Sequence, residues 1–95
     1  MLNATALGAA SLSGRIDMAS CAGLAQPLAQ LAAQGPLQLD LSGVETADSA
    51  ALALLLSARR AAAAAGHPLT LSGIPAGLAT LAGLYNLEPL LRAGD

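Results

Sequence analysis

The chain has 95 residues, enough for one domain, and 55% of them are hydrophobic, with a single Tyr and neither Phe nor Trp. Its four basic side chains are all Arg and are outnumbered by six acidic ones, which gives a net charge of -2. This balance excludes the basic surface that nucleic acid or an anionic membrane requires. We therefore expect one domain, residues 1–95, with an aliphatic core.

The first third of the chain carries weak structural signals. Residues 6–13 predict weak strands, because their alternation is poor, and residues 18–26 predict a loop or a frayed helix. Pro27 suits the first turn of a helix, where its missing N–H costs nothing. Gly35 and Pro36 then end this predicted short helix.

The patterns are clearer from residue 37 onward. Residues 37–41 alternate strictly between apolar and polar, which predicts a strand that ends at Ser42-Gly43. A long helix is predicted at 50–65, with Gly66 just after its end and Pro68 blocking its continuation. Residues 69–72 alternate again and predict a second strand.

The remaining elements complete an α/β pattern. Residues 76–85 predict another helix, and residues 88–91 predict a short last turn. A strand, a helix and a second strand in succession are typical of a crossover connection between strands of a parallel or mixed sheet. We expect an α/β fold in which a small mixed sheet is packed with about four helices.

Residues suited to catalysis are scarce. His67, the single histidine, lies in a turn after the long helix, where an interaction with the helix dipole is the simpler explanation. Cys21 is interpreted as a small apolar side chain, because no base is identifiable near it. One His and one Cys far apart are poor support for a metal site. We expect no catalytic residues, no metal and no cofactor, and an enzyme or small-molecule-binding domain is the least supported alternative.

Several features predict a cytoplasmic protein. A lone cysteine cannot form an internal disulfide and is typical of a reducing compartment. The first residues lack the basic region of a signal peptide. The most apolar stretch, residues 50–65, is shorter than a bilayer requires and contains Arg59 and Arg60, so we expect no transmembrane span.

Asp48 and Ser49 directly precede the long helix. Both residue types are favoured helix N-caps, because their side-chain oxygens accept hydrogen bonds from free backbone N–H groups. A Ser at this position would also receive a phosphate well, since the helix dipole favours negative charge there. Ser49 is therefore a candidate capping residue and a candidate phosphorylation site.

The long helix has apolar residues on two faces. The face expected to pack on the sheet holds Leu52, Leu55, Leu56 and Ala63. The opposite, outward face is expected to hold Leu54, Ala58 and Ala61. Because so small a domain cannot easily bury both faces, we expect the second to bind a partner. A filler helix of high helix propensity is the alternative explanation of the alanine run.

Three motifs, taken in order, resemble the STAS domain family. They are Leu-Ser-Gly-Arg-Ile-Asp at residues 12–17, Leu-Gln-Leu-Asp-Leu-Ser-Gly-Val at 37–44, and Ala-Asp-Ser-Ala-Ala-Leu at 47–52. Leu-Ala-Thr-Leu-Ala-Gly-Leu-Tyr-Asn-Leu at residues 78–87 resembles the ending of MlaB-type STAS proteins. The chain departs from the family pattern at Ala51, where Gly is usual.

The resemblance implies a non-catalytic cytoplasmic subunit that binds the ABC ATPase of a phospholipid transporter, with a permease in the same complex. It implies a location at the inner face of the inner membrane, reached through that complex, and a role in outer-membrane lipid asymmetry. The family places the residue corresponding to Ser49 at the ATPase-facing surface. With the outward helix face, the predicted partner-binding residues are Asp48, Ser49, Ala50, Leu54, Ala58 and Ala61.

The related anti-sigma-factor antagonists provide an alternative function. In those proteins the Ser that matches Ser49 is phosphorylated by a partner kinase, which implies an anti-sigma factor kinase as the partner. Ala51 in place of Gly weighs against functions that need a close backbone approach at this turn, phosphorylation by a kinase among them.

Overall fold

The computed structural model of the protein describes residues 1–6 and 8–87. In chain order its elements are β1 (Leu2–Ala6), β2 (Ala9–Ile16), α1 (Met18–Gln34), β3 (Leu37–Ala47), α2 (Ser49–Ala64), β4 (Leu69–Ser72) and α3 (Ala76–Leu84). The strands form one sheet in the order β1-β2-β3-β4, antiparallel between β1 and β2 and parallel elsewhere. The expected α/β fold with a small mixed sheet is confirmed.

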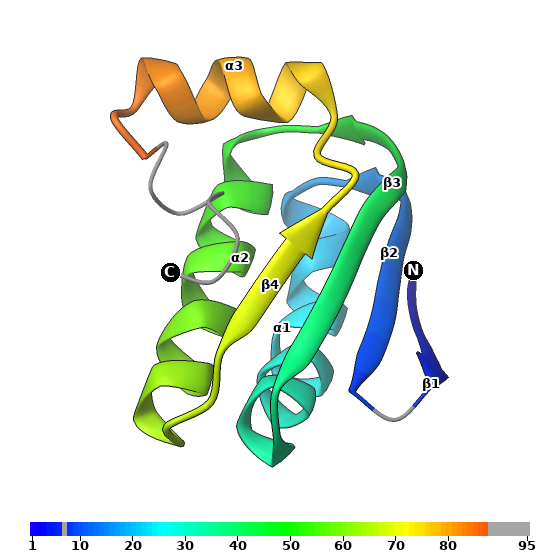
Figure 1. The fold of residues 1–95 in the computed structure, drawn as a ribbon. Coiled ribbons are helices and arrows are strands. Elements are labelled where there is room, and N and C mark those ends of the chain that lie inside the picture. The colour runs from blue at the N-terminus through cyan, green and yellow to red at the C-terminus, as the bar shows by residue number, and fades with distance from the viewer. Residues whose placement is uncertain (7, 88–95) are drawn as a thin grey trace.

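The helices are arranged unequally around the sheet. α1 and α2 lie side by side on one face, and α3 lies at the end toward which β4 runs (Figure 1). The described residues contain three helices where about four were expected, and the turn predicted at 88–91 lies outside them. Among these helices, none is both long and apolar enough to cross a bilayer.

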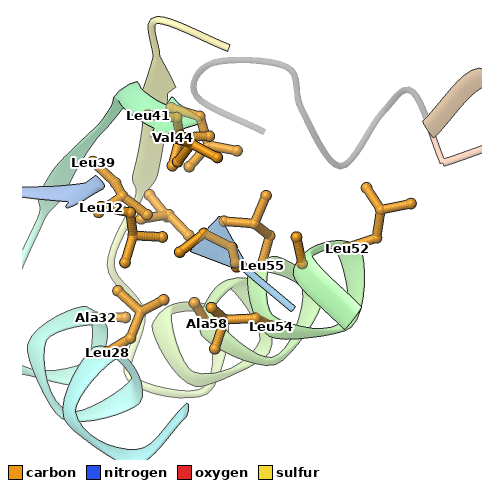
Figure 2. Close-up of a cluster of buried hydrophobic side chains, with 14 of the residues drawn as sticks. Leu12, Leu28, Ala32, Leu39, Leu41, Val44, Leu52, Leu54, Leu55 and Ala58 are labelled. Carbon is orange, nitrogen blue, oxygen red and sulfur yellow. The ribbon is translucent and has the colours of Figure 1, made fainter. Parts of the chain in front are cut away.

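The core lies between the sheet and the two helices. Along β3, Leu37, Leu39 and Leu41 are buried, whereas Gln38 and Asp40 are exposed on the opposite face. This alternation is the pattern that predicted the strand. Figure 2 shows Leu residues of β2, β3 and α2 meeting those of α1 in one apolar cluster.

β3 continues to Ala47 instead of ending at Ser42-Gly43. Its pairing with β2 shifts register around Gly43, and a side chain at Gly43 would come within 3.0 Å of Cβ of Ser13. Glycine here therefore permits the close approach of two strands, and does not mark a turn. The core resumes at Val44, one position out of step with the earlier alternation.

α1 is longer than predicted, because it begins at Met18 and not near Pro27. Its start is fixed by a capping box: Asp17 accepts from the N–H of Ser20 at 3.0 Å, and the hydroxyl of Ser20 accepts from the N–H of Asp17 at 2.9 Å. Pro27 lies inside the helix, exposed. Because proline lacks an N–H, the helix forgoes one hydrogen bond at this position.

The other predicted elements are close to those observed. β1 and β2 replace the weak strands expected at residues 6–13, while β4 covers the predicted residues 69–72. α2 differs from its predicted range by one residue at each end, and α3 by one residue at its C-terminal end. Gly66 follows the C-cap of α2 with a φ of 76°, the left-handed conformation expected after a helix end.

Candidate partner-binding surface

The starts of α1 and α2 lie next to each other at one end of the sheet. Ile16 and Ala47 are register partners at the ends of the parallel strands β2 and β3, and an aspartate follows each of them. Asp17 caps α1, and Asp48 caps α2 by accepting the N–H of Ala50 at 2.8 Å. Parallel strands thus deliver both helix N-termini to the same edge, where sites of open α/β sheets commonly form.

Ser49 is the first residue of α2 and is exposed. The capping oxygen comes from Asp48, so the structure separates the two roles that the sequence left open for this pair. The hydroxyl of Ser49 remains at the surface at the positive end of the helix dipole. Ala51, the departure from the family pattern, is buried in the core.

The outward face predicted for α2 is wrong for Leu54 and Ala58. Their exposed fractions are 3% and 1%, and Ala61 is half-buried. The reason is the full length of α1, which packs along the flank of α2, so that Cys21, Ala22 and Ala25 of its first half border Leu54. The sequence predicted only the second half of α1, and so left this flank uncovered.

The sheet-facing residues need a smaller correction. Leu52 and Leu55 are buried as expected, whereas Leu56 is half-buried and Ala63 is exposed. The buried arc of α2 is therefore displaced from the predicted one toward α1.

Ala50 is half-buried, and its carbonyl accepts a weak hydrogen bond from the thiol of Cys21 at 3.5 Å.

The true outward ridge of α2 is formed by Ser49, Ala53 and Ser57, which are spaced four residues apart and all exposed. We call these three residues the α2 ridge. It is small in side-chain size and uncharged. Ala53 and Ser57 were not among the predicted partner-binding residues, although their four-residue spacing from Ser49 places them on one face once Leu54 faces inward.

An apolar groove runs along each side of the α2 ridge. The groove toward α1 is lined by Met18, Cys21, Ala22, Ala25, Ala50, Ala53, Leu54 and Ser57. The groove toward the end of α3 is lined by Ser49, Leu52, Ala53, Leu56, Tyr85 and Leu87. Within the described part of the chain, the large apolar side chains that remain exposed are Met1, Met18, Leu84 and Tyr85. Two of these four border the α2 ridge, because Met18 lines the first groove and Tyr85 lines the second.

Charged side chains lie at the border of this surface and not within it. Asp17 and Asp48 lie at its upper end, and Arg60 is exposed further along α2. The backbone N–H of Ser20 holds the pKa of Asp17 below its usual value, so this carboxylate is ionised at neutral pH. An apolar centre with a polar rim is the usual composition of a protein interface.

Cys21 and His67 are not brought together. Cys21 contacts the first turn of α2, whereas His67 follows its C-terminus and donates its backbone N–H to Ala62. A helix of this length separates its ends by about 1.5 Å per residue. In the described residues these two groups therefore form no common site.

The fold identifies the class of protein. The structure is similar to that of the anti-sigma factor antagonist SpoIIAA in its unphosphorylated form, with a TM-score of 0.73 and 15% sequence identity over 97% of this chain and 84% of the other. The chain therefore has the STAS fold. No curated protein matches it. The model of the family described as MlaB, STAS domain, matches residues 5–92, and the chain belongs to this family.

Proposed function

We propose that this chain is a non-catalytic cytoplasmic subunit that binds the ABC ATPase of a phospholipid transporter through the α2 ridge. The observation that carries the proposal is the match of the MlaB-type family model to residues 5–92, which includes the ridge and both grooves. The chain would reside at the inner face of the inner membrane through this complex, which also contains the permease. The complex would maintain the lipid asymmetry of the outer membrane.

The chemistry of the surface supports docking of a protein. Ala53 and the short side chains of Ser49 and Ser57 let a partner helix or loop approach the backbone of α2 closely. Met18, 79% exposed, and Tyr85, 55% exposed, stand on either side as apolar anchors. A few side chains, with tyrosine prominent among them, commonly carry most of the binding energy of an interface.

Ser49 has a distinct role in this proposal. Its hydroxyl, not used for capping, is available as a polar contact at the N-terminal end of the α2 ridge. Such a contact fixes orientation, while the apolar anchors supply affinity. A subunit of this kind acts by binding one state of the ATPase more tightly than another, which raises the population of that state.

The test is purification of the tagged chain from its native cells, with the co-purifying proteins identified by mass spectrometry. The proposal predicts recovery of an ABC ATPase together with its permease. Recovery of a histidine-kinase-like anti-sigma factor, with no ATPase, would contradict it. Deletion of the gene should also weaken the outer-membrane barrier, measured as uptake of a large hydrophobic dye.

The alternative function is that of an anti-sigma-factor antagonist, favoured by the fold shared with SpoIIAA. Exposed Ser49 stands where a phosphate would be stabilised by the helix N-terminus and would repel an acidic or apolar partner surface. Ala51 is buried in the core, whereas Ser49 is exposed. This alternative predicts a phosphoryl group on Ser49 in cells, detectable as an increase in intact mass that is absent from Ser49→Ala.

A further inference from the structure

β1 is an edge strand, and its backbone groups alternate in direction. Met1 N donates to the carbonyl of Ser13 at 2.6 Å, and Ser13 N donates back to the carbonyl of Met1 at 2.9 Å. Hydrogen-bonded and non-hydrogen-bonded pairs alternate along an antiparallel ladder, so the next pair, Leu2 and Leu12, is not hydrogen-bonded. The N–H and C=O groups of Leu2, and by the same alternation those of Ala4, point away from the sheet.

Nothing in the sequence of β1 protects this edge. Its residues are Leu-Asn-Ala-Thr-Ala, without the charged side chains or proline by which edge strands usually avoid pairing. Within residues 1–6 and 8–87, no further strand lies beyond β1 in the sheet. Figure 1 shows β1 at the margin of the molecule away from α2 and α3.

An apolar groove adjoins the same edge on the helix side of the sheet. Ala4 and Ala6 line it together with Leu31 of α1. Ala4 pairs with buried Ala10, so its side chain points to the face that carries the helices, and it is nevertheless exposed. A strand added to β1 would therefore find free backbone groups and an apolar recess together.

We propose that two copies of this chain pair through β1, antiparallel, about a twofold axis that passes by Asn3. In this register Leu2 of each copy lies opposite Ala4 of the other, and each such pair exchanges its outward N–H and C=O groups. In each of these two pairs the long side chain of Leu2 faces the short side chain of Ala4, on the face of the sheet that carries the helices. Asn3 meets its copy on the polar side, where Cα atoms of a non-hydrogen-bonded pair approach to about 4.5 Å.

The self-complementary spacing selects a second copy as the occupant. A twofold interface requires a patch that matches itself, and the outward groups of Leu2 and Ala4 flank Asn3 symmetrically. The pairing joins the two sheets into one continuous sheet. It leaves the α2 ridge free on the far side of each copy, so the dimer does not depend on the proposed ATPase docking. Because the strand is short, we expect a weak dimer.

Sedimentation velocity of the purified full chain from micromolar to millimolar concentration tests this pairing. The sedimentation coefficient of the wild type is expected to rise with concentration toward the value of a dimer. Ala4→Pro removes an outward N–H and leaves the bonds to β2 in place. Asn3→Asp sets two carboxylates against each other at the axis. Each substitution is expected to weaken association at least about tenfold, a loss of about 1.4 kcal/mol.

Thr70→Asp is the matched control, because it adds the same charge to β4, the opposite edge of the sheet. It should associate like the wild type, and circular dichroism should show that all three variants are folded. Amide exchange followed by NMR provides a second readout. The amides of Leu2 and Ala4 should become protected only at high concentration, whereas that of Asn3, turned toward Ser11, should be protected throughout.

Three results would overturn the proposal. The first is a chain that remains monomeric over the whole concentration range. The second is association that persists unchanged in both Ala4→Pro and Asn3→Asp. The third is association that Ala53→Asp abolishes while the β1 variants do not, which would assign self-association to the α2 ridge. None of these results bears on recovery of an ATPase from cells.

Discussion

The backbone N–H of Asp48 donates to the carbonyl of Ile16 at 3.3 Å, which ties the start of α2 to the end of β2. Since Asp17 follows Ile16 and caps α1, the first turns of both helices are fixed next to each other at the same end of the sheet. Ser49, as the first residue of α2, is held in place there. A contact residue that is already positioned loses less conformational freedom when a partner binds, and so retains more of its interaction energy.

The cap of α2 depends on the side chain of Asp48. Asp48→Ala is expected to lower the free energy of unfolding by about 1 kcal/mol, because the N–H of Ala50 loses its acceptor. Asp48→Asn retains an oxygen at the same place and serves as the control. Urea unfolding followed by circular dichroism measures both. Equal unfolding midpoints for the Ala and Asn variants would show that the cap contributes nothing.

Substitutions at two neighbouring residues of α2 should change the stability of the protein by very different amounts. Leu54→Ala removes a fully packed side chain between α1 and α2 and is expected to cost about 2–5 kcal/mol of stability. Ala53→Asp changes an exposed position and should alter stability by no more than about 0.5 kcal/mol. Thermal or urea unfolding separates the two. Wild-type stability of Leu54→Ala would restore the outward orientation predicted from the sequence.

Two glycines with similar backbone angles provide a test of packing at the end of β4. Gly73 has a φ of 65°, and a Cβ there would lie 2.7 Å from a carboxylate oxygen of Asp40 and 2.8 Å from Ser42. Gly66 has a φ of 76°, with nothing within 4 Å of the added atom. Both Ala variants place a Cβ in the left-handed region and are strained by roughly 1–2 kcal/mol. Gly73→Ala should therefore be the less stable variant in urea unfolding, and equal losses would contradict the close approach.

Cys21 should make stability depend on pH in the alkaline range. Burial, followed by the charges of Asp48 and Asp17, raises the pKa of its thiol above the usual 9.0. The unfolded chain then loses the thiol proton at lower pH than the folded chain does. The stabilisation is fully present below pH 9.0 and is lost as the pH rises through the folded pKa.

The matched comparison for this effect is Cys21→Ala, which has no thiol to titrate. From neutral pH to above the usual thiol pKa, the free energy of unfolding should fall more steeply for the wild type than for Cys21→Ala. Alkylation of the native thiol by iodoacetamide should also be slow at neutral pH, since the thiolate is the reactive form. Parallel pH profiles of the two proteins would contradict the raised pKa.

The sequence was informative where a local pattern determines structure. Strict alternation at residues 37–41 marks β3, and Gly66 marks the end of α2. Prediction from the sequence failed where contacts between distant residues determine the structure. Gly43 permits a close strand approach inside β3, although its local signal is that of a turn.

Pro27 misled the prediction of α1, and this error determined the error in the candidate site. A proline inside a helix is disfavoured by its own chemistry, so the sequence predicts a loop or a frayed helix at residues 18–26. The capping box of Asp17 and Ser20 is the sequence signal that predicts a helix start at Met18. With α1 at full length, Leu54 must face inward. Asp48 and Ser49 were located from sequence because their place before the helix is a local property.

The central claim, that the α2 ridge docks on an ABC ATPase, is tested most directly by calorimetric titration of the purified ATPase with the wild-type chain, Ala53→Asp and Thr70→Asp. We predict that the wild type and Thr70→Asp bind equally. Ala53→Asp should bind at least about tenfold more weakly, because its carboxylate would be buried without a partner in an apolar interface. Wild-type affinity of Ala53→Asp, or no binding by the wild type, would contradict the account.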